Sequence, residues 1–274
     1  MSENAAPLLA RWTRAATEFR QQPEARQPAV TPSVTVLFTG TCVPRPGLGR
    51  ELYTAYPVVR PAYDAVRAAL DPWLRLPLAA VVFAPQGGVD ADLIRRSEYA
   101  QPALFAFHVA LFKLWQLWGL RAGAVAGTGP GALAAAHVAG MLTLADAARL
   151  VAARGRLVPH RTVTAADARS AAEARSAFLQ AARESAPAPP AVPLLCADTG
   201  RRIGPGPGQS PLTPGHLLHQ VRHAVRSIDA VRALKAAGFP QPHLCGPDPE
   251  DARPGSEIRA ALTGLHRLHD HPGS

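Results

Sequence analysis

The stretch that decides the fold is residues 124–140, AVAGTGPGALAAAHVAG. An apolar run leads into a glycine-rich turn, and an alanine-rich segment of high helix propensity follows the turn. A short buried strand that continues into a helix in this way is typical of α/β domains. We therefore expect a strand that ends near Gly127, then a tight turn, then a helix.

The turn has the spacing of a nucleophile elbow, G-x-S-x-G, in which a strand turns sharply into a helix and presents a serine at its tip. The five residues here are Gly127, Thr128, Gly129, Pro130 and Gly131. Glycine stands at the serine position. The turn therefore keeps the frame of a nucleophile site and lacks the nucleophile.

Composition limits the class of protein. The chain has 274 residues, 47% of them hydrophobic, which is enough for one large domain with a substantial core. Its formal net charge is +9, and only Lys113 and Lys235 of its 29 basic residues are lysines. Such a charge suits an acidic partner. Because the arginines are scattered and no nucleic-acid motif accompanies them, we expect no nucleic acid; the alternative is that the arginine content reflects a GC-rich genome and no partner.

The cysteines Cys42, Cys196 and Cys245 are far apart and form no C-x-x-C pair. This pattern predicts reduced thiols in a cytoplasmic protein, with no disulfide, no metal site and no cofactor. The N-terminus lacks a basic region followed by a long apolar core, and polar residues interrupt the most apolar stretch, 104–120. We therefore expect neither a signal peptide nor a membrane span.

Apolar periodicity divides the chain into three parts. Residues 1–32 are expected to form an N-terminal helix and linker, residues 33–248 an α/β core, and residues 249–274 a loosely ordered tail. Strands of the core are expected within 33–40, 122–127, 186–198 and 243–249. Helices separate these strands, which predicts a parallel sheet covered on both faces.

Four segments carry a resemblance to a known family. They are GRELYTAYPVVRPAYDAV (49–66), EYAQPALFAFHVALFKLWQLWGLRAGAVAG (98–127), AAAHVAGMLTLADAARLVAARGRL (134–157) and VRHAVRSIDAVRALKAAGF (221–239). Together they resemble the acyltransferase domains of modular polyketide synthases, which belong with the malonyl-CoA:acyl-carrier-protein transacylases. The resemblance implies an α/β-hydrolase-like core, an inserted ferredoxin-like small subdomain and an acyl site in the cleft between them. It also implies a serine that takes malonyl from coenzyme A and passes it to a phosphopantetheine thiol.

The resemblance also shows what this chain lacks. The family's G-H-S-x-G falls on residues 127–131, so Gly129 replaces the catalytic serine and Thr128 the histidine before it. The family's G-Q-G, whose glutamine lies beside the oxyanion hole, falls on residues 40–42, where Thr41 replaces the glutamine. The small subdomain of the family lies between the RGRL helix and the catalytic histidine. Here only Val158 and Pro159 stand between Leu157 and His160, which leaves no room for that subdomain.

Two groups of the family's site have counterparts. Arg154 matches the arginine that grips the free carboxylate of the extender acyl group, a role that suits a bidentate guanidinium. The alternative for Arg154 is a structural ion pair on its helix. His160 matches the catalytic histidine, and its alternative is a polar residue at a helix N-terminus. Cys42 and Thr128 are the candidates for a substitute nucleophile, against the alternative that neither has a chemical role.

The sequence thus predicts an α/β-hydrolase-like acyltransferase core with a parallel sheet between helices and without the ferredoxin-like small subdomain. The predicted function is that of a non-catalytic pseudo-acyltransferase of a polyketide or related pathway. It would bind an acyl carrier protein or a ketosynthase-containing polyketide synthase protein, and it would also be able to hold an acyl thioester. The alternative is an acyltransferase or an acyl-thioester hydrolase or cyclase with rearranged active-site chemistry.

Overall fold

The structure is a computed structural model, and it describes residues 34–40, 44–85, 88, 91–157, 165–207, 209, 212–222, 226–239, 242–247 and 256–269. The N-terminal helix and linker expected at 1–32 lie outside these residues, as do Thr41, Cys42 and His160. None of the helices in the described ranges is long and apolar enough to cross a membrane.

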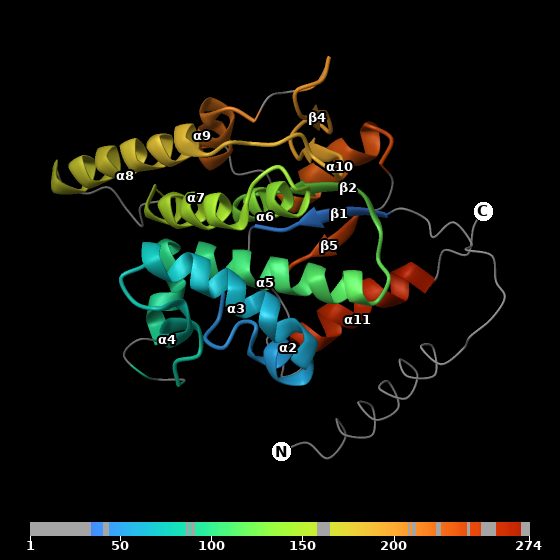
Figure 1. Ribbon diagram of the computed structural model, residues 1–274, viewed down its shortest axis with the longest axis horizontal. Helices are drawn as coiled ribbons and strands as arrows, with labels where there is room; N and C mark the ends of the chain where they lie inside the picture. The colour runs from blue at the N-terminus through green and yellow to red at the C-terminus, as the bar shows by residue number, and fades with distance from the viewer. Residues whose placement is uncertain are drawn as a thin grey trace. The chain divides into compact units, whose positions relative to one another are not determined.

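A sheet with the strand order β4-β3-β2-β1-β5 lies at the centre of the domain (Figure 1). Its strands are β1 (Val34–Phe38), β2 (Ala122–Gly127), β3 (Leu194–Cys196), β4 (Arg202–Ile203) and β5 (His243–Cys245). β1 pairs in parallel with β2 and β5, and β2 in parallel with β3, which confirms the predicted parallel sheet. β4 was not predicted; it pairs antiparallel with β3 across a tight turn and is too short to leave a periodic signal.

The helices follow the order of the sequence. They are α2 (Arg50–Ala55), α3 (Arg60–Leu70), α4 (Leu78–Val82), α5 (Ser97–Leu117), α6 (Pro130–Val138), α7 (Leu144–Leu157), α8 (Ala165–Glu184), α9 (Pro214–Arg222), α10 (Ser227–Ala236) and α11 (Ser256–His269). Single 3-10 turns join several of them, at η1 (Pro57–Val59), η2 (Asp71–Trp73) and η3 (Ala91–Arg95).

The sheet is covered on both faces, as the sequence predicts. Successive side chains of a strand point to opposite faces, so Val36 and Phe38 face one side and Leu37 the other. The first side packs against α5 and α6. The second packs against α10 through Ala230 and Leu234. Figure 1 shows α5 and α10 on opposite sides of the strands.

Helix α5 is the core helix of the domain. Of its 21 residues, 14 are buried, and the helix contacts α3, α6, α7 and α11. A helix that is apolar on nearly every side must be surrounded by protein in a globular domain. Helix α5 therefore buries most of the apolar stretch 104–120 inside the domain.

Within the segment 249–274, which the sequence predicts to be a loosely ordered tail, the structure places a helix, α11. Helix α11 lies against α2, α5 and β5. Its Glu257 and Ala261 side chains are buried, and the indole N–H of Trp115 donates a hydrogen bond of 3.0 Å to the Ala261 carbonyl.

Helices α7 and α8 lie side by side and follow each other directly. α7 ends at Leu157, α8 begins at Ala165, and an Arg149–Glu184 ion pair joins them. Only residues 158–164 connect the two helices, which is far less than a unit of several strands and helices needs. The connection between α7 and α8 therefore has no room for the inserted small subdomain that the resemblance implies.

Candidate functional site

The elbow keeps its backbone geometry without a side chain at its tip. Strand β2 ends at Gly127, α6 begins at Pro130, and Gly129 between them has φ 54° and ψ −129°. Glycine adopts such a positive φ freely, whereas another residue held there stores strain of about 1–3 kcal/mol. Glycine at position 129 therefore removes the strain of the elbow together with its nucleophile.

Packing does not force the loss of the serine. A Cβ atom built on Gly129 would have Gly40 as its nearest neighbour, with the carbonyl oxygen at 3.3 Å and the Cα atom at 3.4 Å. These contacts are tight, but a small side chain fits. The backbone around position 129 therefore leaves enough space for a serine side chain.

Pro130 removes a second part of a nucleophile site. In a nucleophile elbow, the backbone N–H of the residue after the nucleophile is one of the donors of the oxyanion hole. Proline has no N–H, so position 130 cannot donate this hydrogen bond. Proline suits the first turn of α6, because its φ is helical and an N–H there has no partner within the helix. This loss was not predicted, although the residue next to the elbow tip in the sequence reveals it directly.

Thr128 ties the elbow to the end of β1. Its Oγ1 atom accepts a hydrogen bond of 3.0 Å from the backbone N–H of Gly40, and its own N–H donates to the Phe38 carbonyl at 2.9 Å. The side chain is 2% exposed. No imidazole or carboxylate of the described residues is hydrogen-bonded to this hydroxyl. The geometry gives Thr128 a structural task and does not support it as a substitute nucleophile.

Arg154 is a buried cation in the last turn of α7. It is 5% exposed and donates a hydrogen bond to Oε1 of Gln101, whose Nε2 donates to Oγ of Ser97 at 2.7 Å. Burial lowers the pKa of Arg154 to about 10, so the guanidinium remains charged at neutral pH. Within the described ranges no carboxylate lies at ion-pair distance from it, so the alternative of a structural ion pair finds no partner there.

The surroundings of Arg154 compensate its charge only in part. The carbonyl groups at the C-terminus of α7 favour a cation, and the Gln101 amide supplies one acceptor. A buried charge without a counter-charge is costly, and an anion that reaches it is bound strongly. The arrangement therefore suits a carboxylate or a similar anion. Gln101, which the sequence analysis did not single out, is the residue that orients the guanidinium.

His108 does not replace a catalytic base. It lies on α5 beside the end of β1, with its ring centroid 5.8 Å from that of Phe38. The side chain is fully buried, and burial lowers its pKa to about 3. The imidazole is therefore neutral at physiological pH and shielded from any acyl group in solvent.

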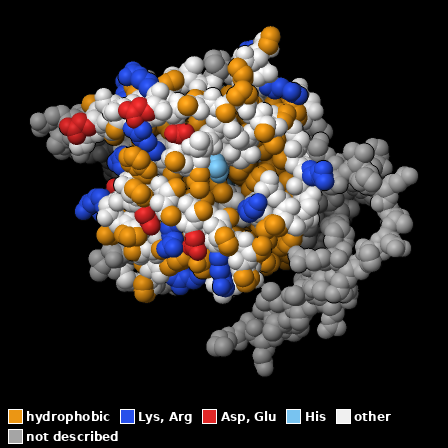
Figure 2. Space-filling view, viewed as in Figure 1, with side chains coloured by type: hydrophobic (Ala, Val, Ile, Leu, Met, Phe, Trp, Pro, Cys, Tyr) orange, Lys and Arg blue, Asp and Glu red, His pale blue; other side chains and the backbone are white. Residues whose placement is uncertain are grey.

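The charged side chains on the face of Figure 2 do not form one patch. Lys and Arg lie singly or in small groups around the face, Asp and Glu lie between them, and hydrophobic side chains fill much of the rest. This distribution agrees with the scattered arginines of the sequence. Among the described residues, no three His, Cys, Asp or Glu side chains lie close enough together to hold a metal ion.

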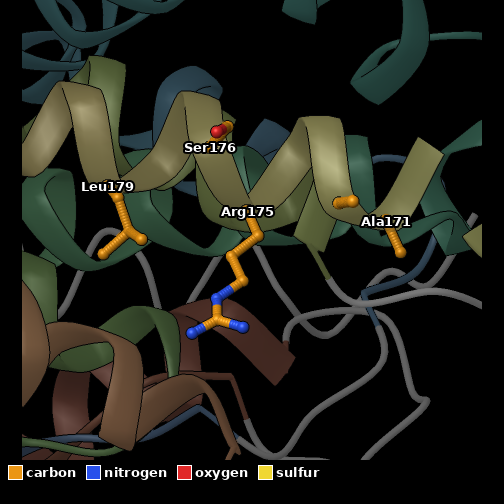
Figure 3. Close-up of a pocket in the computed structure, with 5 residues that line it drawn as sticks. Ala171, Arg175, Ser176 and Leu179 are labelled. Atoms are coloured by element: carbon orange, nitrogen blue, oxygen red, sulfur yellow. The ribbon is translucent and has the colours of Figure 1, made fainter. Parts of the chain in front are cut away.

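A shallow surface pocket lies away from these groups, on α8 (Figure 3). The described residues that line it are Ala171, Ala172, Arg175, Ser176 and Leu179. Arg175 and Leu179 project to the same side of the helix. All five come from one helix, and none belongs to the elbow or to the Arg154 group, so the pocket is not part of the candidate site.

The amino-acid sequence of this chain is similar to those of known acyl transferase domains. The model of the acyl transferase domain matches residues 35–205, more than half of the chain. The polyketide synthase GfsA of Streptomyces halstedii is 51% identical over 122 residues, which cover 44% of this chain and 2% of that protein. The PKS-NRPS hybrid synthetase acdB of Aspergillus candidus is 31% identical over 290 residues, which cover 78% of this chain and 11% of the synthetase. This chain therefore spans only a small part of the length of these relatives.

A solved structure extends the similarity over the whole chain. The acyltransferase domain from the second module of the salinomycin polyketide synthase is 27% identical, with a TM-score of 0.68, over 100% of this chain and 83% of that domain. The similarity in structure thus points to the same family as the similarity in sequence. The chain belongs to the acyl transferase domain family, as found in polyketide synthases.

Proposed function

We propose that this chain is a non-catalytic member of its family, which serves a polyketide or related biosynthetic pathway by binding and not by acyl transfer. The observation that carries the proposal is the elbow, where Gly129 stands at the tip in the elbow backbone geometry and Pro130 follows it. The tip has no nucleophile, and the next residue has no N–H for an oxyanion. The backbone of the elbow remains, and the serine hydroxyl and the oxyanion N–H that would perform the chemistry are absent from it.

The expected effect on kcat of losing both the serine and the oxyanion N–H supports this proposal. Removing the serine of a catalytic triad lowers kcat on the order of 10⁶-fold, and removing one oxyanion donor costs about 10²–10³-fold. Restoring the serine alone leaves the second loss in place. Among the described residues, the Gln101 amide is the one acceptor beside the buried Arg154 guanidinium, which supports a remaining capacity to hold an acyl group with a free carboxylate.

Incubation with malonyl-CoA tests the proposal. We expect intact-mass spectra of the wild-type protein to show no malonyl adduct, and Gly129→Ser to show none either, because Pro130 still lacks the N–H. An active acyltransferase domain treated in the same way serves as the positive control. A stable adduct on the wild type would support the rearranged enzyme in place of a binding protein, and peptide mapping would then identify the acceptor. Release of malonate without an adduct would support a hydrolase.

The same mixture tests binding without transfer. A ligand that binds only the folded state raises the melting temperature. We expect malonyl-CoA to raise the melting temperature of the wild type and to leave the melting temperature of Arg154→Met unchanged. Arg156→Met, at an exposed position in the same turn of α7, is the control, and malonyl-CoA is expected to raise its melting temperature as in the wild type. A response that survives Arg154→Met would remove Arg154 from the site.

The proposed partner is an acyl carrier protein or a ketosynthase-containing protein of the same pathway. Acyltransferase domains of polyketide synthases act with acyl carrier proteins. Carrier proteins are acidic, and the formal charge of +9 on this chain is complementary to them. Long-range attraction of this kind raises association rates and is screened by salt, with a Debye length of about 10 Å at 0.1 M.

Titration against the carrier and ketosynthase proteins encoded nearest to this one tests the partner. We expect weak binding at low ionic strength that declines as salt is added. Absence of binding at low ionic strength would contradict the proposal that a carrier or ketosynthase protein is the partner. Binding that is equally strong at low and high salt would contradict electrostatic attraction between this basic chain and an acidic partner.

A further inference from the structure

The loop that joins α3 to α4 carries two exposed large hydrophobic side chains close together. Trp73 is 40% exposed and Leu76 is 37% exposed, and they lie three positions apart. The other exposed large hydrophobic residues of the described ranges stand singly along the chain. Single exposed apolar side chains are ordinary in folded proteins, whereas grouped ones are typical of interaction sites.

Hydrogen bonds hold this loop in one conformation. The Asp71 carboxylate accepts a hydrogen bond of 2.8 Å from the N–H of Leu78 and so closes the loop between its two ends. In the middle of the loop, the N–H of Leu76 donates a hydrogen bond of 3.0 Å to the phenol oxygen of Tyr99, on α5. A partner that binds a loop already ordered in this way loses little affinity to the ordering of its target.

Two arginines of α7 fix the position of Trp73. The guanidinium carbon of Arg149 lies over the indole, 5.3 Å from the ring centroid, and an ion pair with Glu184 of α8 holds this arginine in turn. Nη1 of Arg156 donates a hydrogen bond of 3.0 Å to the Trp73 carbonyl. Arg149 and Arg156 are seven positions apart, which places them on one face of α7. The indole is therefore held in place while part of it remains exposed.

Exposed positive charge accompanies the two apolar side chains. Arg75 lies between Trp73 and Leu76 in the sequence and is exposed, as is Arg156. Neither arginine forms an ion pair with a carboxylate of the described residues. We call these four residues the Trp73 surface. Tryptophan and arginine are the residue types that contribute most often to the binding energy of protein interfaces.

The Trp73 surface lies next to the candidate site. Arg154 and Arg156 belong to the same last turn of α7, where Arg154 points inward to Gln101 and Arg156 contacts the exposed loop. Figure 1 shows α4 and the C-terminal end of α7 on the same side of the domain, at the left. A protein bound to the Trp73 surface would therefore lie beside the buried guanidinium of Arg154.

We propose that the Trp73 surface is the docking site for an acyl carrier protein, with carboxylates of the carrier at Arg75 and Arg156 and its apolar side chains on Trp73 and Leu76. The inference rests on the partner proposed above and adds the surface that binds it. Charge favours the carrier over a second copy of this chain. Two copies of the surface that face each other would bring arginine against arginine, whereas an acidic carrier is complementary to it.

Fluorescence anisotropy of a labelled carrier protein tests the docking surface. The carrier encoded nearest to this chain is used with its phosphopantetheine arm and without an acyl group, and the full chain is titrated into it at low ionic strength. We expect Trp73→Ala to raise the Kd about 30-fold, which is the effect of losing a hot-spot side chain. Arg75→Glu is expected to raise the Kd about tenfold and to weaken its dependence on salt, because it places a negative charge against an acidic partner.

Two matched controls lie elsewhere on the domain. Leu244→Ala changes an apolar residue of β5 that is 45% exposed, and Arg202→Glu reverses an exposed arginine of β4. Both are expected to bind the carrier as the wild type does. Circular dichroism spectra and thermal melts of every variant verify that it is folded.

Two further variants separate docking from acyl binding. Arg156→Met is expected to weaken carrier binding and to keep the thermal response to malonyl-CoA. Arg154→Met is expected to keep carrier binding and to lose that response. Equal effects of the two variants on carrier binding would contradict a docking surface that is distinct from the Arg154 group.

The outcomes distinguish the surface from the partner. If the wild type binds the carrier and folded Trp73→Ala and Arg75→Glu bind it equally well, the partner stands and the docking surface is wrong. Binding to the ketosynthase protein alone, or self-association that Trp73→Ala abolishes in sedimentation, would contradict the carrier as the occupant. A wild type that binds no carrier at low ionic strength contradicts the carrier as partner, and the docking surface with it.

Discussion

Gly131→Ala is expected to lower the free energy of unfolding by about 3–5 kcal/mol, although it adds a single methyl group. A Cβ atom at this position would lie 2.3 Å from the carbonyl oxygen and 2.7 Å from the carbonyl carbon of Phe38. Both atoms belong to the backbone of β1, and the Phe38 side chain is fully buried, so the strand cannot yield. The methyl group must instead push the start of α6 away from the sheet.

Urea denaturation of Gly131→Ala and Gly129→Ala measures this effect against a matched control. Both variants add one methyl group to the same turn. At Gly129 the nearest neighbour of the Cβ would be 3.3 Å away, so the strain of the positive φ is the main cost, at about 1–3 kcal/mol. Gly131→Ala is therefore expected to be the less stable variant. Stability equal to that of the wild type would show that α6 does not approach β1 so closely.

Trp115→Ala is expected to lower the free energy of unfolding by about 3–5 kcal/mol. The indole is fully buried in α5, so its removal leaves a large cavity among helices that cannot close around it. The substitution also removes the N–H that donates to the Ala261 carbonyl at 3.0 Å and so loses a buried hydrogen bond between α5 and α11. Both effects act on the same contact between α5 and α11.

Two variants separate these effects in thermal and urea melts. Trp115→Phe keeps most of the apolar volume and loses the hydrogen bond, so it is expected to cost less than Trp115→Ala. Trp73→Ala is the control for a tryptophan that is 40% exposed and has the guanidinium of Arg149 over its ring, and it is expected to cost about 1 kcal/mol. A Trp115→Ala loss no greater than that of Trp73→Ala would contradict the packing of α11 on α5.

Much of the fold was readable from local patterns. The β-branched run that ends near Gly40 and the apolar run that ends at Gly127 became β1 and β2, because such runs are stable only when buried in a sheet. The long apolar stretch became the core helix α5. The glycine at the elbow tip was equally visible, because the motif has a fixed spacing. The meaning of Pro130 was available in the same five residues and was missed.

Other features arise from contacts between residues that are distant in the chain. Gln101 meets Arg154 across 53 positions, Gly40 meets Thr128 across 88, and Glu51 meets Glu257 across 206. Propensity and periodicity describe how a residue suits its immediate neighbours, so they predicted the helices and strands of the core and the absence of the nucleophile. They carry no information on which buried amide faces a guanidinium, or on which carboxylate caps a helix from the other end of the chain. Those pairings follow from the packing of whole elements, because burial makes every polar group depend on the partners that the assembled core brings to it.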